Sequence, residues 1–438
     1  MLESMSDTST LASRTAPGRA AARHAAGRGA ADPGRGLRSH GTGFWLVTGV
    51  FALITVIASL PTPLYPLYRQ QDHFSTLMIT VAFGVYSAGV LCTLLTAGHL
   101  SDHLGRRTVI LTAVGVQLAA TAVYISSSSL PALLTGRIVS GMSVGLLTSA
   151  ATAHLGELHA AARPGAHPRR AEMAAVAANL GGIALGPLVG GMLAQWMPQP
   201  LRYSFVAAAA LMVVTAALTL LVPETRTREQ RTGTFRLRPL ALPAAQRGRF
   251  AAAVFAALAA FAVYGLVNAT GPTFLAVDLG RPSHLLAGFL ACVGVAAGAL
   301  VQIALVQAQA RTASALGVAG VPIGLALLVL GANQSSLGLF LAGVIVSGAG
   351  AGALFKGCIA TMAQLTAPAE RAGVTATFFT GAYLGLSVPA IGLGVAAQHI
   401  GLVHALDVFA VVVVVALAAA GAGLLRRPQV APPAPVQA

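Results

Sequence analysis

The sequence places one arginine where its charge needs a partner. Arg137 lies about six residues into an apolar run that begins near residue 131, a depth of about 9 Å at about 1.5 Å per helical residue. A guanidinium inside hydrocarbon is costly unless it faces water, an anion or carbonyl oxygens. Arg137 must therefore face one of these three, or its side chain extends to the outer membrane surface.

A second set of charged residues lies in a short turn between two long apolar runs. Asp102, Arg106 and Arg107 follow one another within ten residues, and Gly98 and Gly105 flank Asp102. Aspartate and arginine are disfavoured in hydrocarbon, so this turn belongs at a membrane surface, where two spanning helices reverse direction. The glycines permit a tight turn and a close approach of neighbouring helices.

The composition indicates which elements must position these residues. The 438-residue chain is 56% hydrophobic and only 9% charged, and its mean hydropathy is +0.77. These values indicate a polytopic membrane protein, and the Ala-, Val-, Leu- and Gly-rich runs without alternation favour helices over a barrel. The net charge of +15 does not indicate a nucleic-acid partner, because the arginines are spread over the connections between apolar runs.

About 20 apolar residues are needed for each span, and twelve helices are predicted on that basis. Their ranges are 44–62, 77–97, 107–126, 131–154, 173–196, 204–223, 250–275, 284–306, 313–332, 336–358, 374–397 and 402–425. With this topology 22 basic residues flank the spans on one side and 3 on the other. The positive-inside rule then predicts a multi-pass protein of the cell (inner) membrane with both termini in the cytoplasm.

The predicted spans fall into two sets of six. The basic, proline-containing connection 224–249 separates a first half, 43–223, from a second half, 250–425; tails at 1–42 and 426–438 complete the chain, and the first tail is predicted to be disordered. Ile138 to Gly141 (Ile-Val-Ser-Gly) recurs as Ile345 to Gly348, and Pro187-x-x-Gly190 recurs as Pro389-x-x-Gly392. The similar offsets predict an all-α fold of two pseudo-symmetric six-helix bundles.

Three motifs resemble those of the major facilitator superfamily, in the expected order and on the expected helices. Gly98-x-Leu-x-Asp102-x-x-Gly105-Arg106-Arg107 is similar to its signature loop, and Leu133-x-x-x-Arg137-x-x-x-Gly141 is similar to its second motif. The run from Gly182 to Gly191, which includes Gly186, Pro187 and Gly190, resembles the fifth-helix motif of its drug:proton antiporters. The resemblance covers about residues 43–425.

The resemblance implies a role for each charged residue. The signature loop is expected to close the cytoplasmic side, with Asp102 accepting hydrogen bonds from the N-terminus of the eleventh helix and Arg106 pairing with Glu157. The alternative is that these charges only fix the topology. Arg137 becomes a candidate for substrate binding or proton coupling. Lys356 is a weaker one, because it lies near the inner end of span ten and can extend to the surface.

In the fifth span, Gly182, Gly186 and Gly190 repeat every four residues and share one helix face. We expect this face to pack closely against a helix of the other half, while Pro187 permits a bend; Gly191 completes the motif. In the family this feature is thought to seal the site against leak during exchange. Packing of small residues without any antiporter meaning is the alternative.

Candidates for the substrate site and for the proton carrier complete the prediction. Tyr264 and Asn268, one turn apart in span seven, are candidates to line a mostly apolar cavity, with Tyr86 and Met142 from spans two and four. Simple packing is the more frequent role of each such residue taken alone. The first span lacks the carboxylate that drug-exporting relatives often carry there. The titrating group stays unassigned among four acids near helix ends: Asp102, Glu157, Asp278 and Asp407.

The predicted function is proton-coupled export of a small hydrophobic drug or metabolite. The sequence shows no phosphate-binding loop, metal-ligand cluster or nucleophile set, so neither an enzyme nor a cofactor is expected. The expected partners are the small-molecule substrate, protons and the lipid bilayer, and a monomer is the default expectation. Two alternatives stay open: a facilitator or importer of a small metabolite, and a membrane receptor or sensor that transports nothing.

Overall fold

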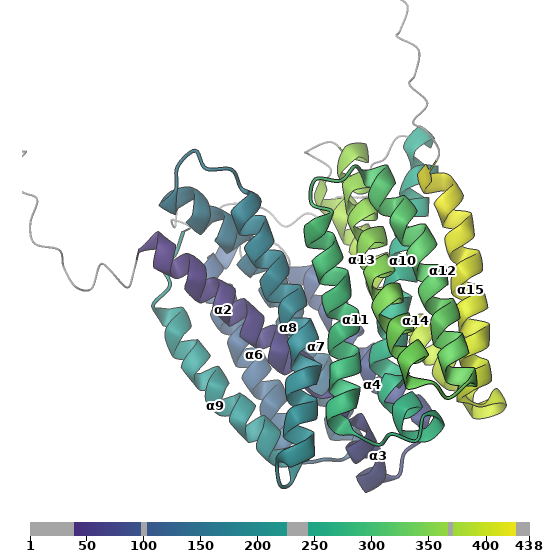
Figure 1. The fold of residues 1–438 in the computed structure, drawn as a ribbon. Helices are drawn as coiled ribbons and strands as arrows, with labels where there is room; N and C mark the ends of the chain where they lie inside the picture. Colours follow the sequence, from purple (N-terminus) through teal and green to yellow (C-terminus); the bar gives the residue numbers. More distant parts are fainter. Residues whose placement is uncertain (1–38, 98–102, 226–243, 367–370, 426–438) are drawn as a thin grey trace, which may run out of the picture.

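The computed structural model of the chain describes residues 39–97, 103–225, 244–366 and 371–425. Within these ranges every element is helical (Figure 1). The elements are α2 (His40–Ser59), η1 (Thr62–Leu64), α3 (Tyr65–Asp72), α4 (Thr76–Ala97), α6 (Arg106–Ser126), α7 (Leu130–Ala162), α8 (Arg169–Trp196), α9 (Pro200–Leu220), α10 (Ala244–Thr273), the π-helix η3 (Phe274–Asp278), α11 (His284–Ala304), α12 (Ala310–Asn333), α13 (Leu337–Leu365), α14 (Arg371–Ile400) and α15 (Leu402–Leu425). The tails and most of the central connection lie outside the described residues.

Twelve segments of the described chain are long and apolar enough to cross a membrane, as predicted. The largest differences in length concern the first, fourth and seventh spans. α2 continues through η1 and α3 to Asp72, because Pro63 and Pro66 occupy the first positions of these short helices, where a missing N–H is tolerated. α7 continues past residue 154 to Ala162, since polar side chains of its last turns find partners on neighbouring elements.

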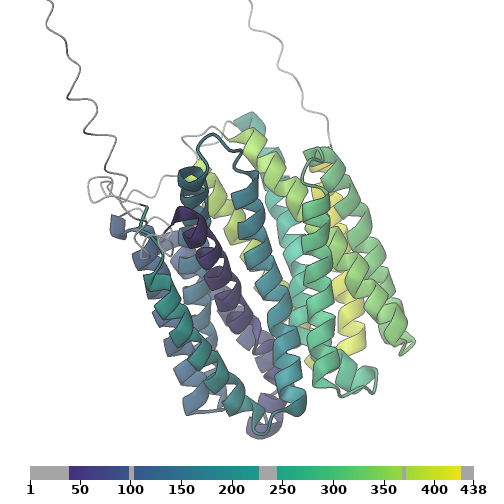
Figure 2. The ribbon, with the colours of Figure 1, turned by 60° about the vertical axis from the view of Figure 1, so that its left-hand side comes forward.

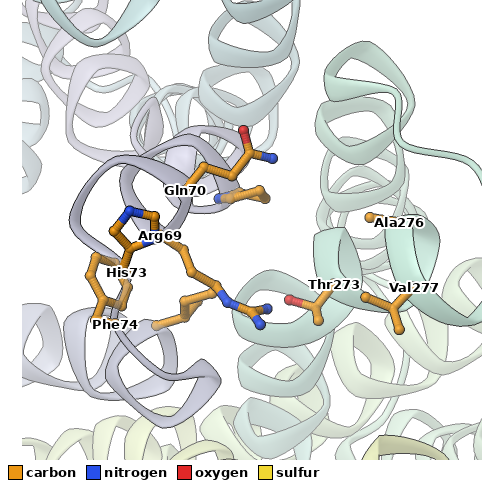
Figure 3. Close-up of a pocket in the computed structure, with 9 residues that line it drawn as sticks. Arg69, Gln70, His73, Phe74, Thr273, Ala276 and Val277 are labelled. Carbon is orange, nitrogen blue, oxygen red and sulfur yellow. The ribbon is translucent and has the colours of Figure 1, made fainter.

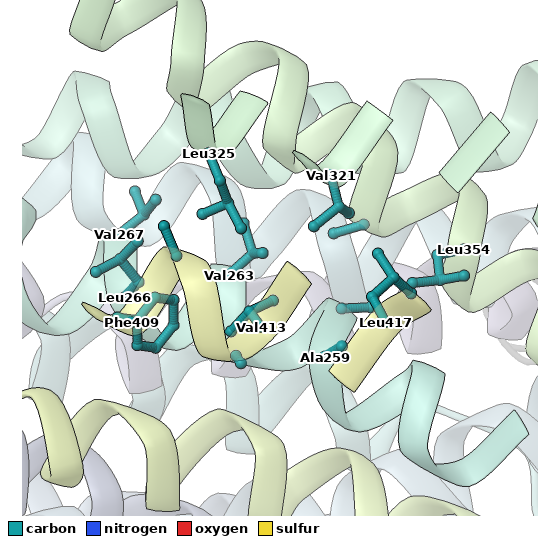
Figure 4. Packing of buried hydrophobic residues seen from close by; sticks show 14 of the residues in the cluster. Ala259, Val263, Leu266, Val267, Val321, Leu325, Leu354, Phe409, Val413 and Leu417 are labelled. Atoms are coloured by element: carbon teal, nitrogen blue, oxygen red, sulfur yellow. The ribbon is translucent and has the colours of Figure 1, made fainter. Parts of the chain in front are cut away.

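The helices form two bundles, each with its own apolar core. In the second bundle the core joins α10, α12, α13, α14 and α15 and contains Phe378 of α14. Figure 4 shows Val263, Leu325, Leu354 and Leu417 of this core packed together. A separate core in the first bundle joins α2, α6, α7, α8 and α9. The apolar residues of each helix are therefore used first within their own bundle.

Equivalent helices make equivalent contacts in the two bundles. Gly141 on α7 lies against α4, where an added Cβ would be 2.1 Å from the Tyr86 carbonyl oxygen. Gly348 on α13 lies against α11 in the same way, and a Cβ added there would be 2.2 Å from the Gly294 carbonyl oxygen. The two glycines belong to the repeated Ile-Val-Ser-Gly sequence, so the internal repeat has a structural counterpart: only glycine permits these backbones to approach so closely.

Two helix pairs, α8 with α11 and α4 with α14, join the bundles at what we call the seam. An added Cβ on Gly288 would lie 2.2 Å from the Pro187 carbonyl oxygen, and the Ser387 hydroxyl donates to the Gly84 carbonyl at 3.3 Å. These contacts lie toward the end of the molecule that carries Pro61, the Pro61 end. Toward the opposite end, which carries Arg106, α8 and α11 diverge (Figures 1 and 2).

Candidate functional site

Arg137 is the most deeply buried charged side chain of the described residues, with only 1% of its surface exposed. Its Nη1 donates to the Ala58 carbonyl at 2.8 Å, and its Nε donates to the Ala82 carbonyl at 3.4 Å. Ala58 lies in the last turn of α2, where helix carbonyls lack partners within the helix. The side chain therefore does not extend to a surface; it connects α7 to α2 and α4 inside the first bundle.

Tyrosine rings surround this guanidinium. Its central carbon lies 4.6 Å from the ring centroid of Tyr86 and 5.7 Å from that of Tyr65, which are distances of cation–π contacts. The hydroxyls of Tyr65, Tyr68 and Tyr124 are buried, and none has a hydrogen-bond partner within the described part of the chain. No described carboxylate forms an ion pair with Arg137. The charge thus keeps the capacity to attract an anion.

The second site forms at the Arg106 end. Arg106 Nη2 lies 3.0 Å from Glu157 Oε1 and its Nε lies 3.2 Å from the same oxygen, so the predicted pairing of these residues is present. Gly105 precedes α6 with a φ of +96°, a conformation that strongly favours glycine. Gly98 and Asp102 lie outside the described residues, and so does the predicted contact of Asp102 with the eleventh helix.

Glu224, which the sequence analysis did not select, completes this second site. Its Oε1 accepts from the Arg106 backbone N–H at 3.0 Å, and its Oε2 accepts from the Arg107 backbone N–H at 3.2 Å. The carboxylate therefore caps α6, whose own N-cap residue is a glycine, and meets the positive end of the helix dipole. The sequence signal for Glu224 was a single acid directly after the sixth apolar run. This signal does not name the partner, because the start of α6 lies more than 100 residues away in sequence.

Further hydrogen bonds fasten the segment 220–225 to the same place. The Arg107 side chain donates to the Val222 carbonyl at 3.3 Å, and a ring nitrogen of the buried His154 donates to the Pro223 carbonyl at 3.1 Å. The Thr225 hydroxyl donates to Glu157. The start of the central connection is thereby tied to both α6 and α7.

The glycine motif of α8 packs differently from the prediction. A Cβ added at Gly182 would lie 1.9 Å from Thr55 Oγ1, and a Cβ added at Gly186 would lie 2.0 Å from Ser59 Oγ. A Cβ added at Gly190 would meet the Leu60 carbonyl oxygen in the same way. All three glycines therefore face α2 or its C-terminus in the same bundle, and the expected packing of this face against the other half is wrong. Gly191, about 100° further round the helix, makes the contact across the seam: a Cβ added there would lie 2.4 Å from the His284 carbonyl oxygen.

The polar residues predicted in span seven form hydrogen bonds within the second bundle. The Tyr264 hydroxyl donates to the Gly348 carbonyl at 3.0 Å, and Asn268 Nδ2 donates to the Tyr264 carbonyl at 2.9 Å. Asn268 is only 6% exposed. Lys356 is half-buried, and it forms no ion pair with another described residue.

Five half-buried aromatic residues, which we call the ring group, gather beside Tyr264. Its members are Phe261, Tyr264, Phe355, Phe379 and Tyr383. The Phe261 centroid lies 4.9 Å from that of Phe355 and 5.9 Å from that of Tyr383, and Phe355 lies 6.3 Å from Phe379. Only Tyr264 of this group could be selected from the sequence, because the spacing of a phenylalanine inside an apolar run does not distinguish a binding residue from a packing residue.

The described candidate proton carriers, Glu157, Asp278 and Asp407, form no ion pair with Arg137, and Asp102 lies outside the described residues. Asp278 ends the π-helix, and its Oδ2 is buried without a hydrogen-bond partner among the described residues. Asp407 Oδ1 accepts from Asn333 Nδ2 at 3.2 Å. Both lie near the Pro61 end, where a pocket of about 450 Å³ is lined by Arg69, His73 and Thr273 among others (Figure 3). This pocket is separate from the Arg137 site.

Comparisons with known proteins place this arrangement among membrane transporters. A family model described as Major Facilitator Superfamily matches residues 46–311. None of the curated protein sequences that were compared matches the chain. A similar solved structure is that of the nucleoside transporter NupG, with a TM-score of 0.68 and 15% identity over 87% of this chain and 99% of that chain.

Two further solved structures share the fold. A bacterial homologue of the human lysosomal transporter Spinster, in an inward-facing and unoccupied conformation, has a TM-score of 0.70 at 15% identity and covers 90% of this chain and 98% of its own. The human organic anion transporter MFSD10 (TETRAN) has a TM-score of 0.60 at 18% identity and covers 89% of this chain and 100% of its own. At these identities the likeness shows the fold of twelve membrane-spanning helices in two bundles.

Proposed function

The chain belongs to the major facilitator superfamily of secondary transporters, and we propose that it exports a small hydrophobic compound in exchange for protons. The observation that carries the proposal is Arg137, fully buried in the first bundle without a carboxylate among the described residues. A buried charge in a membrane protein marks a substrate or ion pathway more often than a packing role. Its partner would then be supplied by the substrate.

Orientation follows from the distribution of basic residues. Because 22 of them flank the spans at the Arg106 end and 3 at the Pro61 end, we place the Arg106 end and both termini in the cytoplasm. The bundles meet toward the Pro61 end and diverge toward the other (Figure 2). This arrangement supports an inward-facing state, in which the substrate enters between the bundles from the cytoplasm.

Helix α8 suits a role in holding the outer closure during exchange. On one side its glycines fit it against α2, and on another Gly191 and the Pro187 carbonyl fit it against α11. A helix held this closely on both sides has little freedom to slide. In this proposal α8 moves as part of the first bundle, and its contact with α11 closes the outer side. The span-five motif limits proton and substrate leak by holding α8 in this position.

The experiment is substrate-triggered proton movement in inverted membrane vesicles that contain the full-length protein. The panel comprises hydrophobic cations, neutral antibiotics and aromatic acids, tested with the wild type, Arg137→Ala and the exposed Arg202→Ala as a matched control. We expect one class to dissipate an imposed pH gradient with the wild type and with Arg202→Ala, but not with Arg137→Ala. Flux without proton movement would instead support a facilitator or importer, and substrate binding without flux would support a receptor.

A further inference from the structure

We propose that the ring group and Arg137 select a planar aromatic compound with an acidic group; this inference rests on the proposed transport function. The ring group consists, as above, of Phe261, Tyr264, Phe355, Phe379 and Tyr383. The substrate's ring is expected to stack within this group at the seam, with its acid directed toward the first bundle.

The geometry of the ring group suits a flat ligand. Its rings come from α10, α13 and α14, and the Phe261 and Phe355 planes are tilted by 54° at 4.9 Å. Phe261 and Tyr383 meet edge to face, with an interplanar angle of 70° at 5.9 Å. These are preferred geometries of aromatic pairs. Since each member is only half-buried, ring surface is left over for a further aromatic partner.

Contacts with the first bundle place the ring group at the seam. Tyr264 packs in a cluster with Ile183 and Ala184 of α8. Tyr383 packs together with Tyr86 against the core of the first bundle. These contacts place Tyr264 and Tyr383 beside the seam.

The charge of the interior favours an acid over a base. Among the described residues only Arg137 and Lys356 carry a charge more than six residues from an end of their helix, and both are positive. Aromatic faces attract cations, but Arg137 already lies over Tyr86 at 4.6 Å. In a medium of low effective dielectric constant these uncompensated positive charges repel a bound cation and attract a bound anion, so the acid is preferred.

Tyr86 connects the two parts of the site. Its ring centroid lies 4.6 Å from the central carbon of the Arg137 guanidinium, and both Tyr86 and Tyr383 pack against the core of the first bundle. In this proposal, the acid of a ligand stacked beside Tyr383 is directed toward Tyr86 and the buried charge of Arg137. Binding of the acid would give Arg137 the counter-charge that the described residues do not supply.

The test is equilibrium binding to the full-length protein in lipid nanodiscs with three probes: 2-naphthoate, the naphthalen-2-ylmethylammonium cation and cyclohexanecarboxylate. We expect 2-naphthoate to bind at least tenfold more tightly than either other probe. Phe261→Leu and Phe355→Leu should weaken 2-naphthoate at least fivefold and leave cyclohexanecarboxylate unchanged. Phe255→Leu is the matched control, because Phe255 lies on the same helix α10 and is 57% exposed.

Tighter binding of the cation, or equal binding by Phe261→Leu and the wild type, would overturn the inference. If Phe261→Leu does not fold, Phe261→Tyr keeps a ring at this position and should retain 2-naphthoate binding; loss of binding by this folded variant would also contradict the inference. Transport in the vesicles separates the two proposals. Binding with the expected preferences but without flux would overturn the transport function alone, whereas proton-coupled flux of a non-aromatic cation would overturn the substrate class alone.

Discussion

The guanidinium of Arg106 is paired with the carboxylate of Glu157, with Nη2 and Oε1 3.0 Å apart, although 51 residues separate them in sequence. The Arg106 side chain is 7% exposed and that of Glu157 is 30% exposed. The pair joins the first turn of α6 to the last turns of α7. Glu224 binds the backbone of the same arginine, so one residue holds three segments of the first bundle together.

Removing one member of this pair should weaken the first bundle. Arg106→Ala leaves Glu157 without its guanidinium partner, and we expect a loss of about 1 to 2 kcal/mol, moderated because Glu157 is partly solvated. The apparent melting temperature in detergent measures the effect. A double-mutant cycle with Glu157→Ala should give a coupling of about 1 kcal/mol. Arg163→Ala, at an exposed position, is the control, and an equal loss there would contradict the prediction.

Glu224→Ala should destabilise the start of α6. The substitution removes two charge-assisted bonds to the Arg106 and Arg107 N–H groups, and a lost helix cap costs about 1 kcal/mol. Hydrogen exchange of the first turn of α6 should increase, because these amides lose their acceptors. Glu172→Ala, in the first turn of α8, tests whether any acid near a helix start has this effect. Unchanged exchange in α6 would show that Glu224 is dispensable.

The sequence predicted the fold well, because the information needed is local. Each span is a long apolar run bounded by charge, and a bilayer excludes other arrangements. The pairing of Arg106 with Glu157 was implied by the resemblance of the loop to the family's signature motif, which places both residues near the same membrane surface. The partner of Glu224 could not be predicted, because helix capping across more than 100 residues depends on where the end of α9 packs.

The glycine face of α8 shows a second limit of sequence reasoning. Its period of four correctly predicts a close helix contact but does not name the partner, because neighbouring residues point about 100° apart. Gly190 and Gly191 accordingly contact different bundles. The ring group was missed for a related reason: Phe261 and Tyr383 lie more than 100 residues apart and meet only after α10 and α14 pack.

Arg137 should be essential for coupling and not replaceable by lysine. Arg137→Lys keeps the charge, but one ammonium lacks the planar set of donors that reaches both the Ala58 and Ala82 carbonyls. We expect at least a tenfold loss of substrate-triggered proton movement for Arg137→Lys and a larger loss for Arg137→Ala. Thermal stability measured in parallel separates this effect from unfolding. Wild-type coupling by Arg137→Lys would show that the charge alone is sufficient.

Replacing single glycines of α8 by alanine should distinguish the role of this helix in packing within the first bundle from its role in closure at the seam. A Cβ at Gly191 would lie 2.4 Å from the His284 carbonyl oxygen of α11, whereas a Cβ at Gly181 would meet nothing within 4 Å. Gly191→Ala must therefore push α8 and α11 apart, because a backbone oxygen cannot yield as a flexible side chain can.

We expect Gly191→Ala to lower transport at least tenfold. It should also increase the labelling, by a water-soluble maleimide, of a cysteine placed at Thr273, which lines the pocket at the Pro61 end. Gly181→Ala should leave both unchanged. Gly186→Ala, which meets Ser59 and the Val56 carbonyl of α2, should lower thermal stability without raising the labelling, because it disturbs contacts inside one bundle. Equal labelling of Gly191→Ala and Gly181→Ala would contradict the assignment of outer closure to the crossing of α8 and α11.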